Sequence, residues 1–121
     1  MELLLRREAY ERVAALLLAP GQILHAPHLL DVEVAQVLRR LEQTSALSAT
    51  RAQEALEDVK ALRLVRHAHL PLLDRVWGLR SNLSAYDALY VALAESLDAP
   101  LVTTDKRLKA SPLHRAEVVI P

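Results

Sequence analysis

Three acidic residues, far apart in the chain, have the types and positions that could bind a divalent cation. Asp87 falls in the first turn of an apolar segment, residues 84–95, that is expected to form a buried helix. Asp105 ends a short segment, residues 100–105, that is expected to form a strand. Glu33 lies at the margin of the apolar stripe of an amphipathic helix expected over residues 29–43.

Carboxylates that converge in space repel one another, and a divalent cation relieves that repulsion. Because the candidate ligands are all oxygen donors and the chain has no Cys, the pattern favours Mg²⁺ or Mn²⁺ over zinc. Such a cation polarises a phosphoryl group and activates water. The chemistry that this suggests is hydrolysis of a phosphodiester bond.

Each acid also has a simpler explanation. Ser84 and Asp87 have the spacing of a helix-capping pair, Asp105 could cap a following helix, and Glu33 could be a partly exposed border residue. Against capping, Asp87 is the only charged residue between Arg80 and Glu95, and an acid on so apolar a helix is costly to bury without a partner. At this point both interpretations stay open.

Other residues carry weaker signals. Thr103, two positions before Asp105, would point to the same side of a strand and offer a hydroxyl there. His67 and His69 could share one side of a strand, but no further zinc-type ligands accompany them. Trp77 is expected in the core or on a partner surface. With two Gly in all, the chain has no glycine-rich loop for phosphates.

Composition indicates one globular domain spanning residues 1–121. Apolar residues make up 52% of the chain and charged residues 25%, with 15 cations balancing 15 anions, so no broad basic field for nucleic acid is visible. No apolar run is long enough to span a membrane and no signal peptide is recognisable. The absence of Cys fits a reducing compartment, so a cytoplasmic location is expected.

Helices and short strands alternate along the chain, which predicts an α/β fold with a short, mostly parallel sheet flanked by helices. Ligands of such sheets sit beyond the carboxyl ends of the strands, where Asp105 would fall. The predicted helices cover residues 2–18, 29–43, 48–62, 71–80 and 84–95, with a short one near 106, and the predicted strands cover 22–26, 64–67, 100–105 and 117–120.

Three segments in this order resemble the PIN-domain ribonucleases, and in particular the VapC-type toxins of toxin–antitoxin pairs. They are HAPHLLDVEV at residues 25–34, YDALYVALAE at 86–95 and APLVTTDKRL at 99–108. The segment RSNLS at 80–84 also fits. The resemblance covers nearly the whole chain.

The resemblance implies a three-layer PIN-like sandwich and a metal-dependent endoribonuclease that is neutralised by a cognate antitoxin and forms a homodimer. Residue by residue, Glu33, Asp87 and Asp105 match three of the family's four catalytic, metal-binding acids. The family pattern also gives supporting polar positions at Thr103 and Ser84. Candidate residues for holding RNA phosphates are Arg80 and Arg107.

The fourth family acid ends an N-terminal strand that lies in the middle of the sheet. This chain begins at what resembles the following helix, so we expect the strand and its acid to be absent and the domain to be truncated relative to the family. An upstream start, a strand donated by another chain, closure by the outer strands, or a decayed copy would each explain this. The alternative function is therefore a catalytically impaired binding module that keeps only antitoxin or dimer contacts.

Overall fold

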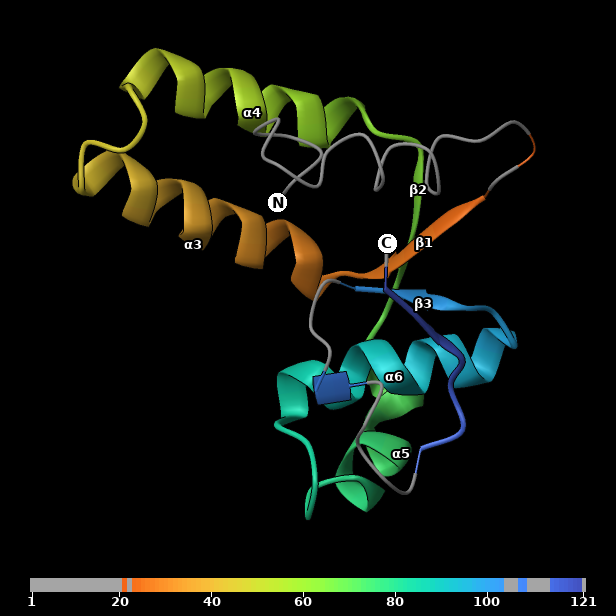
Figure 1. The fold of residues 1–121 in the computed structure, drawn as a ribbon. Coiled ribbons are helices and arrows are strands. Elements are labelled where there is room, and N and C mark those ends of the chain that lie inside the picture. The colour runs from red at the N-terminus through yellow and green to blue at the C-terminus, as the bar shows by residue number, and fades with distance from the viewer. Residues whose placement is uncertain (1–20, 22, 104–106, 109–113, 121) are drawn as a thin grey trace. The chain divides into compact units, whose positions relative to one another are not determined.

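The computed structural model of the protein describes residues 21, 23–103, 107–108 and 114–120 (Figure 1). These fall into two compact units, one over residues 1–65 and one over residues 66–121, and each is described by itself. The helix predicted over residues 2–18 lies outside the described residues, as do Asp105 and Lys106.

The first unit consists of a strand and a pair of packed helices, followed by a strand that leads out of it. The elements are β1 (Leu24–Pro27), α3 (Leu29–Gln43), α4 (Ala49–Ala61) and β2 (Leu64–His67). β1 and β2 form a two-stranded sheet. The sequence predicted these helices and β2 to within a residue. α4 begins where predicted because the Ser48 hydroxyl accepts a hydrogen bond from the Arg51 backbone N–H at 3.1 Å.

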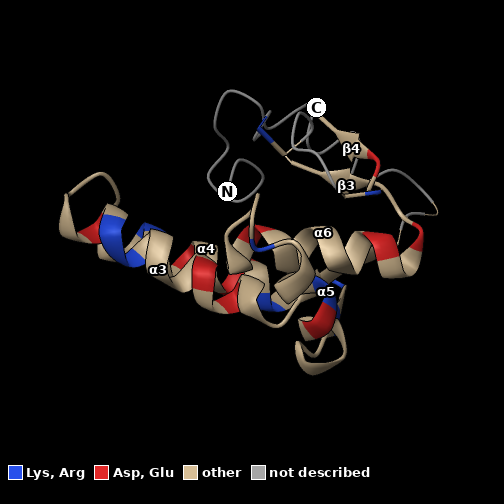
Figure 2. Ribbon diagram, turned by 90° about the horizontal axis from the view of Figure 1, so that it is seen from below, with Lys and Arg blue, Asp and Glu red and all other residues tan. Residues whose placement is uncertain are grey.

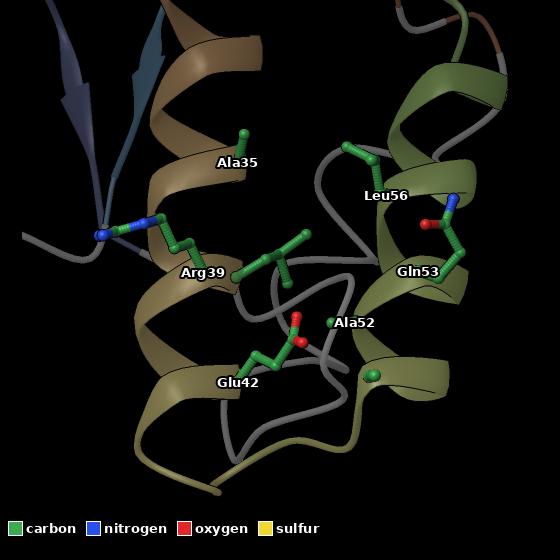
Figure 3. A pocket seen from close by; sticks show the side chains of 8 residues that line it. Ala35, Arg39, Glu42, Ala52, Gln53 and Leu56 are labelled. Atoms are coloured by element: carbon green, nitrogen blue, oxygen red, sulfur yellow. The ribbon is translucent and has the colours of Figure 1, made fainter.

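The apolar faces of α3 and α4 pack on each other and form the core of this unit. The residues at its centre are Val34, Leu38, Ala55 and Val59. Beside them is a shallow groove of about 190 Å³ (Figure 3). Ala35 and Glu42 of α3 face Ala52 and Leu56 of α4 across it, whereas Arg39 extends away. The groove holds one acid and no cluster of catalytic side-chain types, so it is a packing feature of the helix pair.

The second unit begins with a turn of 3₁₀-helix, η1 (Leu70–Leu72), and a short helix, α5 (Leu73–Gly78). The sequence predicted one helix over residues 71–80. The difference arises because Pro71 lacks a backbone N–H and disfavours α geometry in the residue before it. Helix α5 ends at Gly78, a poor helix former.

Helix α6 (Ala85–Leu97) is the core element of the second unit. Figure 2 shows it mainly without charge, unlike α3 and α4. A helix that is apolar around most of its circumference is stable only when it is buried. Six of its residues accordingly belong to the core: Ala88, Leu89, Val91, Ala92, Leu93 and Ala94.

Two short parallel strands, β3 (Leu101–Val102) and β4 (Val118–Val119), complete the second unit. The Leu101 N–H donates to the Glu117 carbonyl at 2.8 Å and the Thr103 N–H donates to the Val119 carbonyl at 3.1 Å. The described strands thus form two two-stranded sheets, β1 with β2 and β3 with β4. The α/β class predicted from the sequence is confirmed.

None of the described helices is both long enough and apolar enough to cross a membrane.

Candidate metal site

The Asp87 carboxylate, at the start of α6, has no partner among the described residues. The Asp87 backbone N–H donates to the Ser84 hydroxyl at 3.2 Å, so Ser84 caps the helix. The Asp87 residue is half-buried, and its carboxylate has no hydrogen-bond or ion-pair partner in the part of the chain that the structure describes. A reciprocal capping role would require that carboxylate to accept a bond from the Ser84 N–H. The described contacts therefore assign the cap to Ser84 and leave the Asp87 oxygens open.

Thr103 directly follows β3, which covers Leu101–Val102 and is shorter than the strand predicted over residues 100–105. Thr103 is half-buried, and its backbone is held by the bond to Val119. Asp105 follows two residues later and lies outside the described residues. The strand that leads to Asp105 is therefore established, and the position of its carboxylate stays a prediction.

Glu33 lies on α3 at the margin of the apolar face, as predicted. It is half-buried, between the exposed Val32 and the buried Val34. Glu33 belongs to the first unit and Asp87 to the second, so their convergence on a shared ion stays a prediction. Within the described ranges, no three His, Asp or Glu side chains gather as a metal site.

The chemistry of the candidate ligands suits a hard cation. All three are carboxylates, with a Thr hydroxyl close in sequence to the third, and Mg²⁺ and Mn²⁺ prefer oxygen donors of this kind. The open carboxylate of Asp87 is the structural observation that fits, because a half-buried acid without a protein partner is stabilised by binding a cation.

The two candidate phosphate ligands are both exposed Arg residues. Arg107 lies two positions after Asp105 in a short helical stretch. Arg80 lies seven positions before Asp87, with its guanidinium carbon 4.6 Å from the centre of the Trp77 ring. Trp77 as a whole is 68% exposed, so it is a surface residue rather than a core one.

Glu95, in the last turn of α6, is the strongest electrostatic feature of the second unit, and the sequence reasoning missed it. Its side chain is 5% exposed and forms a two-point ion pair with Arg75, with Nε–Oε1 at 2.7 Å and Nη2–Oε2 at 3.0 Å. The Arg115 backbone N–H also donates to it at 2.6 Å. These hydrogen bonds, chiefly the one from Arg75, lower the pKa of the Glu95 carboxyl despite its burial.

The Glu95 ion pair is separate from the candidate metal site. Glu95 lies eight positions after Asp87 on the same helix, which corresponds to roughly 12 Å at 1.5 Å per residue. A cavity of about 330 Å³ beside Glu95 lies at the same far end of α6. The sequence did hold a signal for Glu95 alone, because an acid near a helix C-terminus interacts unfavourably with the helix dipole and is stabilised by a nearby cation.

Comparison with known proteins identifies the family of this chain. The model of the PIN domain family matches residues 1–112. The chain belongs to the PIN-domain family. The PIN-like fold and the resemblance stated from the sequence motifs are thereby confirmed.

Several relatives of this PIN-domain protein are named VapC ribonucleases. VapC ribonuclease Mb0985 of Mycobacterium bovis is 48% identical over 91 residues, which is 75% of this chain and 72% of the relative. Ribonuclease VapC1 of Mycobacterium tuberculosis is also 48% identical over 91 residues, covering 74% of this chain and 68% of the relative. Ribonuclease VapC12 of the same species is 36% identical over 118 residues, covering 98% of this chain and 90% of the relative.

Proposed function

We propose that this PIN-domain protein is a metal-dependent endoribonuclease toxin of the VapC type, which hydrolyses phosphodiester bonds in RNA. The observation that carries the proposal is the open carboxylate of Asp87, held at the capped start of α6 with no protein partner among the described residues. The ribonuclease names of its relatives support the same activity.

In this proposal, Glu33, Asp87 and Asp105 hold Mg²⁺ or Mn²⁺. When bound, the cation would neutralise charge on the scissile phosphate and ease the deprotonation of water. The chain's own contribution is to position these groups. Ser84 fixes the first turn of α6 and with it the Asp87 backbone, while the pairing of β3 with β4 holds the strand that Thr103 follows.

Further parts of the proposal concern the rest of the site and its partners. Arg80 and Arg107 would hold RNA phosphates, and residues 1–121 would act as one PIN-like domain. A cognate antitoxin would neutralise the activity, and the domain would work as a homodimer. Because its substrate would be cellular RNA, the proposal includes a cytoplasmic location.

Removal of divalent metal is expected to abolish RNA cleavage by the purified full chain. With EDTA in excess, the ion that neutralises the clustered carboxylates and the phosphate is gone, and cleavage should fall to background. Excess Mn²⁺ or Mg²⁺ should restore it. Cleavage is followed by gel electrophoresis of end-labelled RNA, with the Asp87→Asn protein purified in parallel as a control for contaminating ribonucleases.

Two outcomes would contradict the proposal. Cleavage that persists in EDTA would exclude a role for the metal. A folded chain that binds RNA but never cuts it with either ion would indicate the binding module rather than the enzyme.

A further inference from the structure

Trp77 and Arg80 form an exposed pair in the second unit that the metal site does not use. The Arg80 guanidinium lies 4.6 Å from the centre of the Trp77 ring, and its Nη1 donates to the Trp77 carbonyl at 2.8 Å. The hydrogen bond fixes the cation over the aromatic ring. The Trp77 residue is nevertheless 68% exposed, which is unusual for a side chain with so large an apolar surface.

The charge of Arg80 is not neutralised by any of the residues that the structure describes. No carboxylate pairs with it in the described part of the chain, whereas Arg75 and Arg115 of the same unit both contact Glu95. An exposed aromatic ring beside an unpaired cation is the combination that proteins use to bind single-stranded nucleic acid, because bases stack on the ring and phosphates neutralise the charge.

The backbone connects this pair firmly to the helix that carries Asp87. Leu79, between Trp77 and Arg80, is fully buried, and its carbonyl accepts hydrogen bonds from the N–H groups of Asn82 and Leu83, each at 3.1 Å. Ser84 then caps α6. An ordered turn of a few residues therefore separates the aromatic ring from the first turn of α6.

We propose that Trp77 and Arg80 form a base-stacking subsite for single-stranded RNA, in which a base packs on the Trp77 ring and Arg80 contacts the adjoining phosphate. The inference rests on the proposed function, since it assigns to the nuclease a contact with a nucleotide that flanks the cut bond. Leu70 and Leu73, which are also exposed, would border the subsite without stacking.

Trp77 is the single tryptophan of the chain, so its fluorescence reports on this subsite directly. The full chain is titrated in EDTA, which prevents cutting, with octa-adenylate and with an abasic RNA of the same length. Octa-adenylate should quench the emission of Trp77 strongly and the abasic strand should not. Emission that stays unchanged at saturating octa-adenylate, verified with a fluorescein-labelled strand, would overturn the proposal.

Matched variants distinguish base stacking on the Trp77 ring from the effect of the Arg80 charge and from nonspecific apolar contact. Trp77→Leu keeps an apolar side chain but removes the ring, and should weaken octa-adenylate binding roughly 5- to 100-fold while leaving abasic binding unchanged. Trp77→Phe should restore part of the loss. Arg80→Gln should weaken both strands and reduce the salt dependence by about one phosphate contact. Circular dichroism melting checks that these surface variants stay folded.

The outcomes also distinguish this inference from the proposed function. If Trp77→Leu binds octa-adenylate as the parent does, the subsite is absent, and the inference fails even if the chain cuts RNA with Mn²⁺. If the same variant instead lowers the molecular mass in sedimentation, the face is an interface between copies, which also overturns it. Quenching by octa-adenylate without any cleavage in Mn²⁺ would retain the subsite and reject the nuclease.

Discussion

The Asp87→Asn variant is expected to lose at least about 100-fold of the RNA-cleaving rate while remaining folded. A bound cation contributes several kcal/mol to the stabilisation of transition-state charge, and each 1.4 kcal/mol corresponds to a factor of ten in rate. The amide has nearly the shape of the carboxylate but lacks its charge. Because the Asp87 carboxylate has no described protein partner, no hydrogen bond or ion pair is broken by the change.

The stability of this variant separates a functional acid from a structural one. Asp87 lies in the first turn of α6, where its charge interacts favourably with the helix dipole, so in EDTA the free energy of unfolding of Asp87→Asn should stay within about 1 kcal/mol of that of the parent. Asp98→Asn is the matched control on the same helix. Asp98 is exposed and adopts the left-handed conformation at the helix end with φ 49°, which Asn also tolerates. It should retain full activity, and an Asp87→Asn protein that cuts RNA normally would contradict the role assigned to Asp87.

The second large effect is expected on stability, from Glu95→Gln. This change removes the charge from a nearly buried ion pair and leaves Arg75 without its counter-ion. Breaking a fully buried pair costs about 3–5 kcal/mol, and the partial exposure of the Arg75 side chain reduces this to about 2 kcal/mol. Urea unfolding at neutral pH measures the loss. Activity in the still-folded fraction should be retained, because Glu95 lies at the opposite end of α6 from Asp87.

The same pair predicts a pH dependence with a definite sign. The pKa of Glu95 is lower in the folded protein than in the unfolded chain, so its stabilising effect is complete above the unfolded pKa of about 4.3 and disappears as the pH falls through the lower, folded value. The difference in unfolding free energy between the parent and Glu95→Gln should therefore be constant from pH 7 to pH 5 and shrink below about pH 4.

A surface pair provides the comparison for Glu95. Arg51 Nη1 lies 3.6 Å from Glu54 Oε2 on α4, and the Glu54 side chain is 62% exposed. Such pairs contribute about 0–1 kcal/mol, so Glu54→Gln should change stability little at any pH. If Glu95→Gln behaved like Glu54→Gln, the ion pair of Glu95 would not hold the second unit together.

Local sequence patterns were sufficient for most of the elements. The apolar spacing in α3 and the Ser caps of α4 and α6 lie within a few residues of the helices that they define, so both types and bounds could be predicted. The helix predicted from Pro71 was wrong in its bounds, since the local effects of Pro71 and Gly78 outweighed the apolar pattern. Contacts between residues distant in sequence were harder to predict. Arg75 and Glu95 are 20 residues apart, and no local pattern identifies them as partners.

For the candidate site too, the sequence predicted local positions better than contacts. The sequence placed Asp87 in the first turn of its helix, and the structure confirms this position. The sequence placed Thr103 within a strand over residues 100–105, whereas β3 covers Leu101–Val102 and Thr103 follows it. The sequence could not decide whether Asp87 caps α6, because that depends on whether the Ser84 hydroxyl or the Asp87 carboxylate accepts the backbone hydrogen bond at the helix start. The spacing of residues in the sequence could not predict the exposure of Trp77 or its contact with Arg80 either. An aromatic residue on a helix can lie in a core as well as on a surface.

The central claim is that Glu33, Asp87 and Asp105 share one cation. Calorimetric titration with Mn²⁺ of the parent chain and of Glu33→Gln, Asp87→Asn and Asp105→Asn tests it most directly. The account predicts that the parent binds Mn²⁺ and that each single variant binds at least about tenfold more weakly, because each loses a charged ligand of the same ion. Mn²⁺ affinity equal to that of the parent in any one of the three would contradict a shared site.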